Sequence, residues 1–322
     1  MHVDTQLEAA LRALDHWPRF RLRLFFEGIV VGILSGTVIS FFRWGLEMGT
    51  VWRQWIYANV LASGGVLLNL SWFGVLLAAA LLLWRLGIYE PNAGGSGIPQ
   101  VKGVILGAIR MRWLRILWVK LVGGIVGIGL GLSLGREGPS IQIGAVTAQG
   151  LSRALGRTRM EERYLITAGA SAGLAAAFNA PLAGVMFALE ELHRNFSGVV
   201  LAPSMAAALL ATMVSRYVFG RAPVFHFGML PPFPLRYMWL VVILGIIIGL
   251  AGVVFNKGLL NIHYFYDLPV FRNNYMRIAF ALCMAGILGY VFPEVLGGGN
   301  DLVNSLYTLP LSLKLFAGLL IG

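Results

Sequence analysis

The chain has 322 residues, of which 58% are hydrophobic and only 12% are charged, a balance that excludes an ordinary soluble domain. The formal net charge of +11 is not gathered into a dense basic stripe with interleaved aromatic residues, so we expect no nucleic-acid partner. The single cysteine, Cys283, lies in an apolar run, which leaves no intrachain disulfide and no cysteine-based metal site.

Residues 1–23 are the first predicted segment, an amphipathic stretch that mixes acidic, basic and apolar side chains. It lacks the apolar core and the small-residue cleavage site of a signal peptide, so we expect it to be retained. Basic residues also gather at 85–115 and 153–163. Because positively charged loops tend to stay inside, we predict that both connections and the N-terminus are cytoplasmic.

Three later stretches are long and apolar enough to cross a membrane, which takes about 20 apolar residues in a helix. Residues 66–84 and 237–255 contain no charge, and 165–189 is longer still but is interrupted by Asn179 and Pro181. No soluble domain or long linker stands between them. We therefore predict that 1–322 form a single all-α membrane domain.

Glycine and proline repeatedly break the apolar segments. The breaks are GGSGIPQ at 94–100, GREGP at 135–139, FNAPLAG at 178–184 and FPEVLGGGN at 292–300. Any one of them could be an ordinary loop outside the bilayer. Four together, each bordered by apolar sequence, favour helices that are broken at membrane depth, where only protein or a water-filled cavity can surround the free backbone. Paired broken helices are the best indication of a transport site that a sequence offers.

The GREGP motif places a glutamate inside an apolar stretch. A charge in a membrane segment costs about 2.5–3.5 kcal/mol on insertion scales and is a functional candidate by default. Adjacent residues of a helix do not face each other, so we expect Arg136 and Glu137 to point to different places. The glycines and Pro139 predict a helix start, whose bare N–H groups attract an anion. The Glu137 carboxylate would then compete with an anion for that position.

GGSGIPQ follows the same pattern. Its glycines allow close backbone approach, Ser96 offers a hydroxyl, and Pro99 favours a helix start. Two helix N-termini and a hydroxyl would hold a small anion by partial charges alone, weakly enough to release it. The simpler alternative, a turn with Ser96 as a helix N-cap, is compatible with this prediction.

These motifs occur in an order and spacing that resemble the CLC family of chloride channels and chloride/proton antiporters. The resemblance rests on GSGIP, on GREGP followed by SIQIG, on FNAPLAGVMFALEEL and on GGGN, and it covers nearly the whole chain. It implies a fold of tilted, broken helices in two inverted repeats. It also implies a lipid-embedded homodimer in a bacterial inner membrane, with one anion pathway in each subunit.

The resemblance also assigns roles to residues. Ser96 would coordinate a central chloride ion, Glu137 would be the outer gate and a proton carrier, and Glu191 would pass protons to the cytoplasm. Glu190 would help on the proton route. The anion site is expected to comprise Ser96, Gly97, Ile98, Arg136, Glu137 and Gly138.

Two family features have no counterpart in the sequence: a third anion-binding motif, G-x-F-x-P, and a later tyrosine. Both would lie beyond Gly322, so we expect the sequence to be part of a longer protein. A natural truncation, or a second chain that supplies the rest, is the alternative. Gln100 and Lys102 stand where some relatives carry acids, which would alter the field of the inner vestibule.

The predicted function is therefore exchange of chloride for protons, with no cofactor and no metal. A passive chloride channel is the alternative, and Glu191 argues against it because channels of the family generally carry an apolar residue there. A fluoride exporter would usually depart from Ser96 and Pro139. An enzyme is not expected, since the five histidines show no metal-site spacing and Ser96 has no evident base. A purely structural membrane protein would not need two carboxylates at membrane depth.

Two minor expectations concern charges near these motifs. His193 and Arg194 are expected to be solvated at a helix end, where cations are favoured. Lys120 lies within an apolar run. It would either raise the potential along the anion path or extend its ammonium group to the membrane surface.

Overall fold

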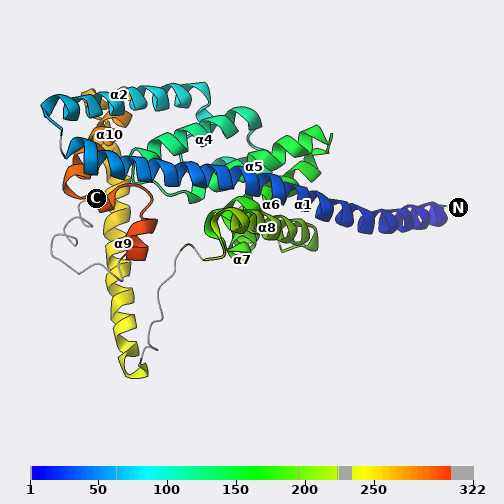
Figure 1. Cartoon of the computed structure of the whole chain (residues 1–322). Helices are drawn as coiled ribbons and strands as arrows, with labels where there is room; N and C mark the ends of the chain where they lie inside the picture. Colours follow the sequence, from blue (N-terminus) through cyan, green and yellow to red (C-terminus); the bar gives the residue numbers. More distant parts are fainter. Residues whose placement is uncertain (1, 63, 195, 223, 225–233, 306–322) are drawn as a thin grey trace.

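The computed structural model describes residues 2–62, 64–194, 196–222, 224 and 234–305, and within these ranges the chain is helical with no strand. Figure 1 shows the arrangement of the helices. Their bounds are α1 His2–Trp55, α2 Val66–Tyr89, α3 Ile98–Ile105, α4 Trp113–Gly129, α5 Glu137–Ala154, α6 Arg159–Phe178, α7 Pro181–Phe187, α8 Gly198–Phe219, α9 Met238–Tyr266, α10 Asn274–Val291 and α11 Asn300–Ser305. Short 3₁₀ or π-helical turns occupy Ile56–Leu61, Pro91–Ala93, Ala188–His193, Leu235–Tyr237, Pro269–Phe271 and Pro293–Val295.

Five of the described helical stretches are long and apolar enough to cross a membrane: Arg19–Leu61, Val66–Tyr89, Gly198–Phe219, Leu235–Tyr266 and Asn274–Val291. The predicted spans at 66–84 and 237–255 fall within α2 and almost wholly within α9, so both predictions are confirmed. The first span was not singled out from the sequence. In the structure it continues the same helix that begins at His2, and the side chains of residues 1–18 lie outside the described part, so the amphipathic character of 1–23 stays a prediction.

The apolar stretch 165–189 does not form one membrane span: it is divided at the interruption that its composition predicts, and neither part is among the five stretches above. Asn179 adopts a left-handed conformation with φ of 58° and ends α6, which is a common way for a helix to stop. Pro181 then begins α7, where its missing N–H leaves no hydrogen bond unmade. The chain turns between these two residues, so α6 and α7 are separate helices that pack on each other.

Small residues let α1 and α8 approach closely. Gly28, Gly32 and Gly36 recur every four residues and so share one face of α1. A Cβ on any of them would come within 3 Å of the α8 backbone, at Pro203, Ala207 and Ala211 respectively. This is the small-residue packing typical of membrane helices, and the glycine spacing could have revealed it from the sequence.

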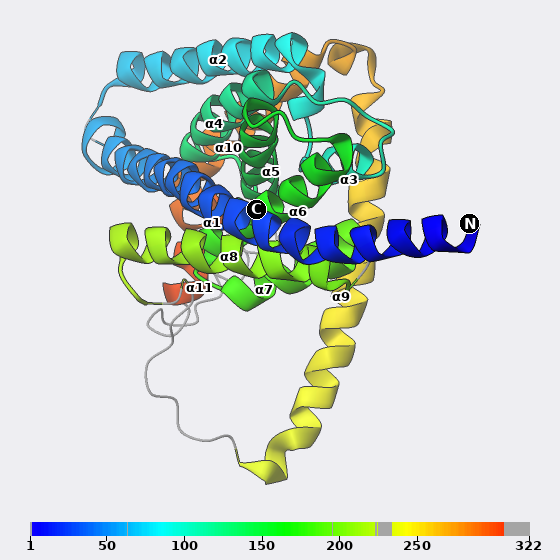
Figure 2. The same ribbon diagram turned by 90° about the vertical axis from the view of Figure 1, so that its right-hand side faces the viewer.

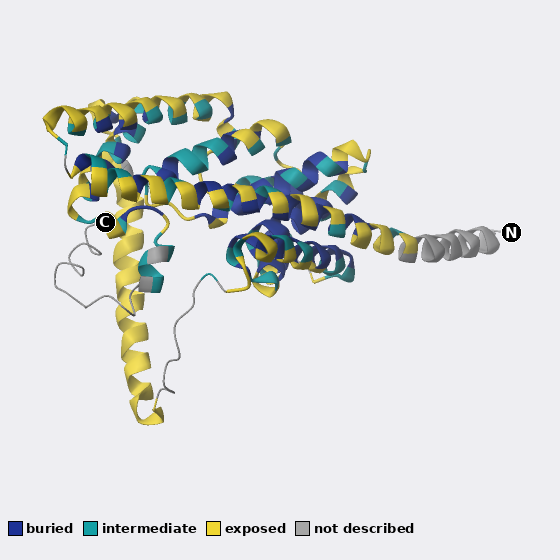
Figure 3. Ribbon diagram, in the orientation of Figure 1, coloured by how far each residue is buried: buried dark blue, intermediate teal, exposed yellow. Residues whose placement is uncertain are grey.

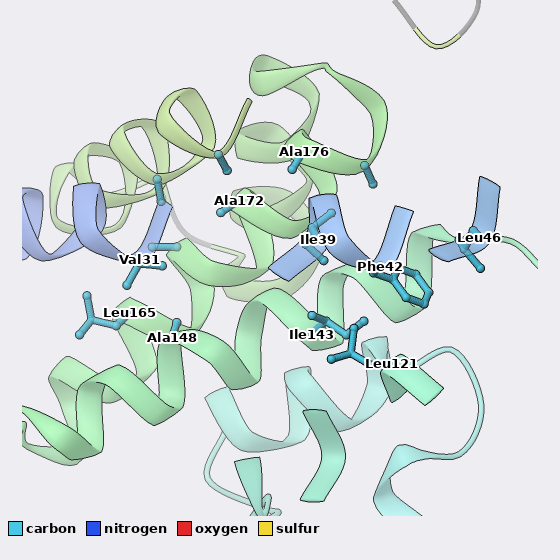
Figure 4. Packing of buried hydrophobic residues seen from close by; sticks show 14 of the residues in the cluster. Val31, Ile39, Phe42, Leu46, Leu121, Ile143, Ala148, Leu165, Ala172 and Ala176 are labelled. Atoms are coloured by element: carbon cyan, nitrogen blue, oxygen red, sulfur yellow. The ribbon is translucent and has the colours of Figure 1, made fainter. Parts of the chain in front are cut away.

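The core lies where α1, α4, α5, α6 and α8 meet. Figure 4 shows its buried apolar side chains, among them Ile39 and Phe42 of α1, which point toward Ile143 of α5 and Leu121 of α4. Glycines bring α5 and α6 into backbone contact, since a Cβ on Gly144 would overlap the Gly169 carbonyl oxygen. These two helices therefore form a closely packed pair.

Helix α9 stands apart from this body. Figures 1 and 2 show it extending away from the other helices, and Figure 3 shows it exposed along its length. None of the apolar window within Leu235–Tyr266 is buried. The last turn of α9 contacts the segments that follow it, where Phe265 packs on Phe271 and Phe280. The exposed apolar surface of the rest suits a lipid or protein environment and not water.

Candidate functional site

The GSGIP loop leads into helix α3 as predicted. Gly97 has a φ of 91°, a conformation that favours glycine, and α3 begins at the next residue. The Ser96 hydroxyl accepts a hydrogen bond from the backbone N–H of Ile98, with a distance of 3.4 Å from N to Oγ. No acceptor in the described part of the chain takes the Ser96 hydroxyl proton. That proton is consequently available to an anion at the start of α3.

Two side chains hold the loop before α3. Lys120 of α4 is only 6% exposed, and its ammonium group donates to the Gly95 carbonyl oxygen at 2.6 Å. Gln100 donates to the Gly94 carbonyl oxygen at 3.1 Å. The alternative that Lys120 extends to the membrane surface is therefore wrong. The Lys120 ammonium is instead buried beside the loop. Its partner is a neutral carbonyl group and not a carboxylate, so the positive charge is not neutralised.

The GREGP motif also begins a helix, since α5 starts at Glu137 with Arg136 as its N-cap. The two charged side chains diverge, as the sequence predicts. Arg136 is 8% exposed and lies over the Phe178 ring, with 5.4 Å from its guanidinium carbon to the ring centroid. Glu137 is exposed, and its carboxylate turns back over the backbone of Gly135. The carboxylate therefore lies beside the N-terminus of its own helix.

The two motifs meet through their glycines. A Cβ on Gly138 would lie 2.5 Å from the Ser96 carbonyl oxygen and 2.9 Å from the Ser96 Cα. A Cβ on Gly97 would lie 2.5 Å from Oε1 of Gln142, which is on α5. The N-terminal ends of α3 and α5 are thus packed together, and the expected anion-site residues Ser96, Gly97, Ile98, Arg136, Glu137 and Gly138 are gathered at this junction.

The glutamate pair lies on the π-helical segment Ala188–His193, which continues α7. Glu190 is exposed, whereas Glu191 forms an ion pair with Lys102 of α3, with 2.8 Å from Nζ to Oε1. The hydrogen bond and the charge of Lys102 lower the pKa of the Glu191 carboxyl, and Arg194 adds a smaller effect in the same direction. Glu191 is therefore ionised at neutral pH.

Helix α3 links these two regions. Ser96 precedes its first turn, and Lys102 follows Ile98 by four residues, about 6 Å along a helix axis. The start of α3 faces the junction with α5, and a later turn of α3 contacts the Glu191 segment. A single short helix therefore separates the expected anion site from the expected inner proton carrier.

His193 differs from the expectation. It is half-buried, with Nδ1 at 3.4 Å from the Thr167 hydroxyl oxygen and its ring at 5.7 Å from the Tyr164 ring. Burial lowers the pKa of the imidazole, so His193 is neutral at pH 7. The expectation of a solvated His193 is wrong, because its ring packs against Tyr164 and Thr167 of α6. Arg194 is exposed, as predicted.

Comparison with known proteins gives a consistent result. The family model described as "Voltage gated chloride channel" matches residues 73–322. The H(+)/Cl(-) exchange transporter ClcA of Vibrio vulnificus is 32% identical over 312 residues, which cover 92% of this chain and 66% of the relative. ClcA of Salmonella schwarzengrund is 34% identical over 305 residues, which cover 91% of this chain and 63% of the relative. The chain thus spans just under two thirds of the length of these relatives.

Solved structures show the same relationship. A slow cyanobacterial Cl⁻/H⁺ antiporter superimposes with a TM-score of 0.81 at 30% identity, over 92% of this chain and 71% of that structure. A CLC-type fluoride/proton antiporter gives a TM-score of 0.73 at 24% identity, over 93% of this chain and 74% of that structure. The second likeness shows the fold alone.

Proposed function

Because the chain belongs to the voltage-gated chloride channel family, or CLC family, we propose that the protein exchanges chloride for protons across a membrane. The fold and the membrane-spanning helices are those of this family, which makes the chain a multi-pass membrane protein. The observation that carries the proposal is the junction of the α3 and α5 N-termini, with one carboxylate at the junction and a second one beyond α3.

The junction has the properties of a weak anion site. Two helix N-termini present oriented N–H groups, and their dipoles favour negative charge. The Ser96 hydroxyl adds a donor, and the ammonium of Lys120, bonded to Gly95, adds a buried positive charge close by. No side-chain cation needs to touch the anion. A site built from partial charges holds chloride loosely enough for the ion to leave, which transport requires.

The two carboxylates supply the proton steps of the proposed exchange. Glu137 lies at the first residue of α5, so its ionised form competes with chloride for the same helix N-terminus. When it takes a proton, that competition ends and the side chain is free to swing outward. Glu191 lies across α3 and exchanges protons with cytoplasmic water, and Glu190 assists beside it. Chloride and protons thus share the outer part of the route and diverge inward.

The carboxylate at Glu191 favours exchange over a passive chloride channel. A channel needs only an anion pathway, whereas an ionisable group separated from that pathway by α3 gives protons a route of their own. Fluoride is the weaker choice of anion, because the likeness to the fluoride/proton antiporter shows only the fold and because Ser96 and Pro139 are both present. In this proposal the N-terminus is cytoplasmic and each subunit of a homodimer carries its own pathway.

Flux measurements on the purified protein in liposomes test the proposal. A chloride gradient is imposed, and external pH and chloride are recorded together. The wild type should move protons uphill, and Glu191→Gln should retain passive chloride movement but lose proton movement, because an amide cannot take up and release the proton. Glu190→Gln is the matched neighbour and should keep most of the coupling.

The outcomes separate the candidate functions. Chloride flux without proton movement in the wild type would support a channel. Intact coupling in Glu191→Gln together with loss of coupling in Glu190→Gln would move the inner proton step to Glu190. Selective flux of fluoride over chloride would contradict the proposed substrate.

A further inference from the structure

The ion pair between Lys102 and Glu191 joins two elements that are far apart in sequence. Lys102 lies on α3 and Glu191 on the π-helical segment, and their charged atoms are 2.8 Å apart. The Lys102 side chain is 25% exposed and that of Glu191 is 47% exposed, so water reaches both groups. Protons from water can therefore reach the pair, which is stabilised by a hydrogen bond and by the attraction of opposite charges.

The remaining charges around Glu191 are few among the described residues. Lys102 is the only titratable side chain of α3, and α7 carries none. Helix α6 presents Tyr164 and Thr167 to His193. The charged residues of α6 lie in its first two turns, and three of them are engaged elsewhere: Glu161 pairs with Arg23, Glu162 pairs with Arg153, and the Arg163 guanidinium lies against Gly107. The basic residue of α8, Arg216, is in the last turn of that helix. On the segment of Glu191 itself, Glu190 is exposed, and so is Arg194, the residue that follows the segment. Lys102 is thus the cation in direct contact with the Glu191 carboxylate.

We propose that Lys102 is a positioning residue that controls when Glu191 takes up a proton, an inference that rests on the proposed exchange of chloride for protons. The ammonium group holds the carboxylate against α3 in its ionised form. Each proton that travels through Glu191 comes from cytoplasmic water and binds to a carboxylate oxygen, which opens the ion pair. When that proton leaves, the carboxylate is ionised again and the ion pair re-forms. Lys102 keeps its own charge throughout.

The direction of the pH effect follows from the geometry. The Lys102 ammonium donates a hydrogen bond to the Glu191 carboxylate and places a positive charge beside it; both effects favour the ionised form and lower the pKa of Glu191. At any pH above that pKa, a smaller fraction of Glu191 carries a proton than it would without Lys102. Proton movement in the wild type should therefore decline as the cytoplasmic pH rises. Without the ammonium, the same decline should begin at a higher pH.

The test compares proton flux in liposomes across a series of pH values on the side that Glu191 faces, under a fixed chloride gradient. Lys102→Met removes the charge and should shift the profile to higher pH. At neutral pH its proton flux should rise by about two- to fivefold, the scale of a partly exposed ion pair. Lys102→Arg keeps the charge and should retain the wild-type profile. Lys102→Gln, which keeps a hydrogen-bond donor without charge, should shift the profile in the same direction but by less than Lys102→Met, and it repeats the test if the methionine variant folds poorly.

A second comparison separates this role from an effect on the anion path. Lys102→Met is introduced into Glu191→Gln, where no carboxylate remains to be controlled, and passive chloride flux is measured. That flux should match the flux of Glu191→Gln alone. If Lys102→Met changes chloride flux in the wild-type background and changes it equally in the Glu191→Gln background, Lys102 acts directly on chloride.

The result that overturns the proposal is a wild-type pH profile for Lys102→Met in a protein that couples chloride to protons. If the wild-type protein itself moves chloride without moving protons, the proposed exchange is refuted, which is a different outcome. A profile that shifts equally in Lys102→Arg and Lys102→Met would assign the effect to side-chain shape and would also overturn the proposal.

Discussion

The backbone of Gly138 lies directly against the backbone of Ser96, so that a Cβ on Gly138 would be 2.5 Å from the Ser96 carbonyl oxygen. This contact brings together two motifs that are separated by about 40 residues of sequence. Ser96 lies two residues before the first residue of α3, and Gly138 is the second residue of α5, so the contact holds the N-terminal ends of the two helices together. The contact therefore determines whether the two N-termini can act on one anion.

A methyl group at Gly138 should separate these N-termini. Gly138→Ala is expected to destabilise the protein by about 1–3 kcal/mol, the range for overpacking a close contact, and to reduce chloride flux strongly. The matched control is Gly123→Ala in α4, where a Cβ would meet its nearest neighbour, Leu83, only at 3.8 Å. Melting temperature and liposome flux are measured for both variants. Equal behaviour of the two would show that the junction tolerates a side chain.

Loss of the hydroxyl at Ser96 should weaken chloride binding. Ser96→Ala removes the hydroxyl donor of the proposed anion site, and hydrogen bonds to charged groups contribute about 1.5–3 kcal/mol. Calorimetric titration of the purified protein with chloride measures the change in affinity. Ser71→Ala is the control, because Ser71 is exposed and its hydroxyl donates to the Leu68 carbonyl within α2. Unchanged affinity in Ser96→Ala would remove this residue from the anion site.

Neutralising Glu137 should uncouple chloride from protons. Glu137→Gln resembles a permanently protonated side chain, so chloride flux should persist but lose its pH dependence and its coupling. Efflux from liposomes over a pH series is the measurement. Glu47→Gln provides the control, since Glu47 is an exposed carboxylate that pairs with Arg43 at 3.2 Å. Proton pumping at the wild-type level in Glu137→Gln would rule out this residue as the gate.

Removing the ammonium of Lys120 should loosen the loop before α3. Lys120→Met removes the part-buried hydrogen bond to the Gly95 carbonyl oxygen, and a hydrogen bond to a charged group contributes about 1.5–3 kcal/mol. Stability and chloride affinity should therefore fall together. Lys257→Met, on the exposed surface of α9, should change neither quantity. A variant at Lys120 with normal melting temperature and normal chloride affinity would contradict the assigned role.

Helix starts and helix breaks were the features that the sequence predicted best. Gly97 before Pro99 and the glycines around Glu137 each mark a helix start, because backbone conformation at glycine and proline is decided locally. Asn179 followed by Pro181 ends one helix and begins another for the same reason. The family resemblance of the ordered motifs was confirmed by the family model.

Contacts between distant residues were harder to predict. The sequence marks Lys102 as a cation where some relatives carry an acid, but nothing local pairs it with Glu191, 89 positions later. The two meet only because α3 and the π-helical segment pack side by side. Lys120 is a second case, since a lysine in an apolar run can either be buried or extend its ammonium group to the membrane surface. Its partner is the Gly95 backbone carbonyl, and the direction of that carbonyl cannot be predicted without the conformation of the loop.

The glycine contact between α5 and α6 limits how any gate on α5 can operate. Gly144 and Gly169 leave no layer of side chains between the two helices, and Gly173 repeats the contact against Ser140 one turn away. Helices that touch through their backbones have no intervening side chains that could change rotamer, so one helix cannot easily slide or rotate against the other. Movement of α5 against α6 is therefore restricted, and a gate at Glu137 would act by reorientation of its side chain, which takes picoseconds to nanoseconds when the side chain is exposed. The slow event in each cycle should then be the arrival or departure of an ion or a proton, and rates should depend on concentration and pH more than on membrane stiffness.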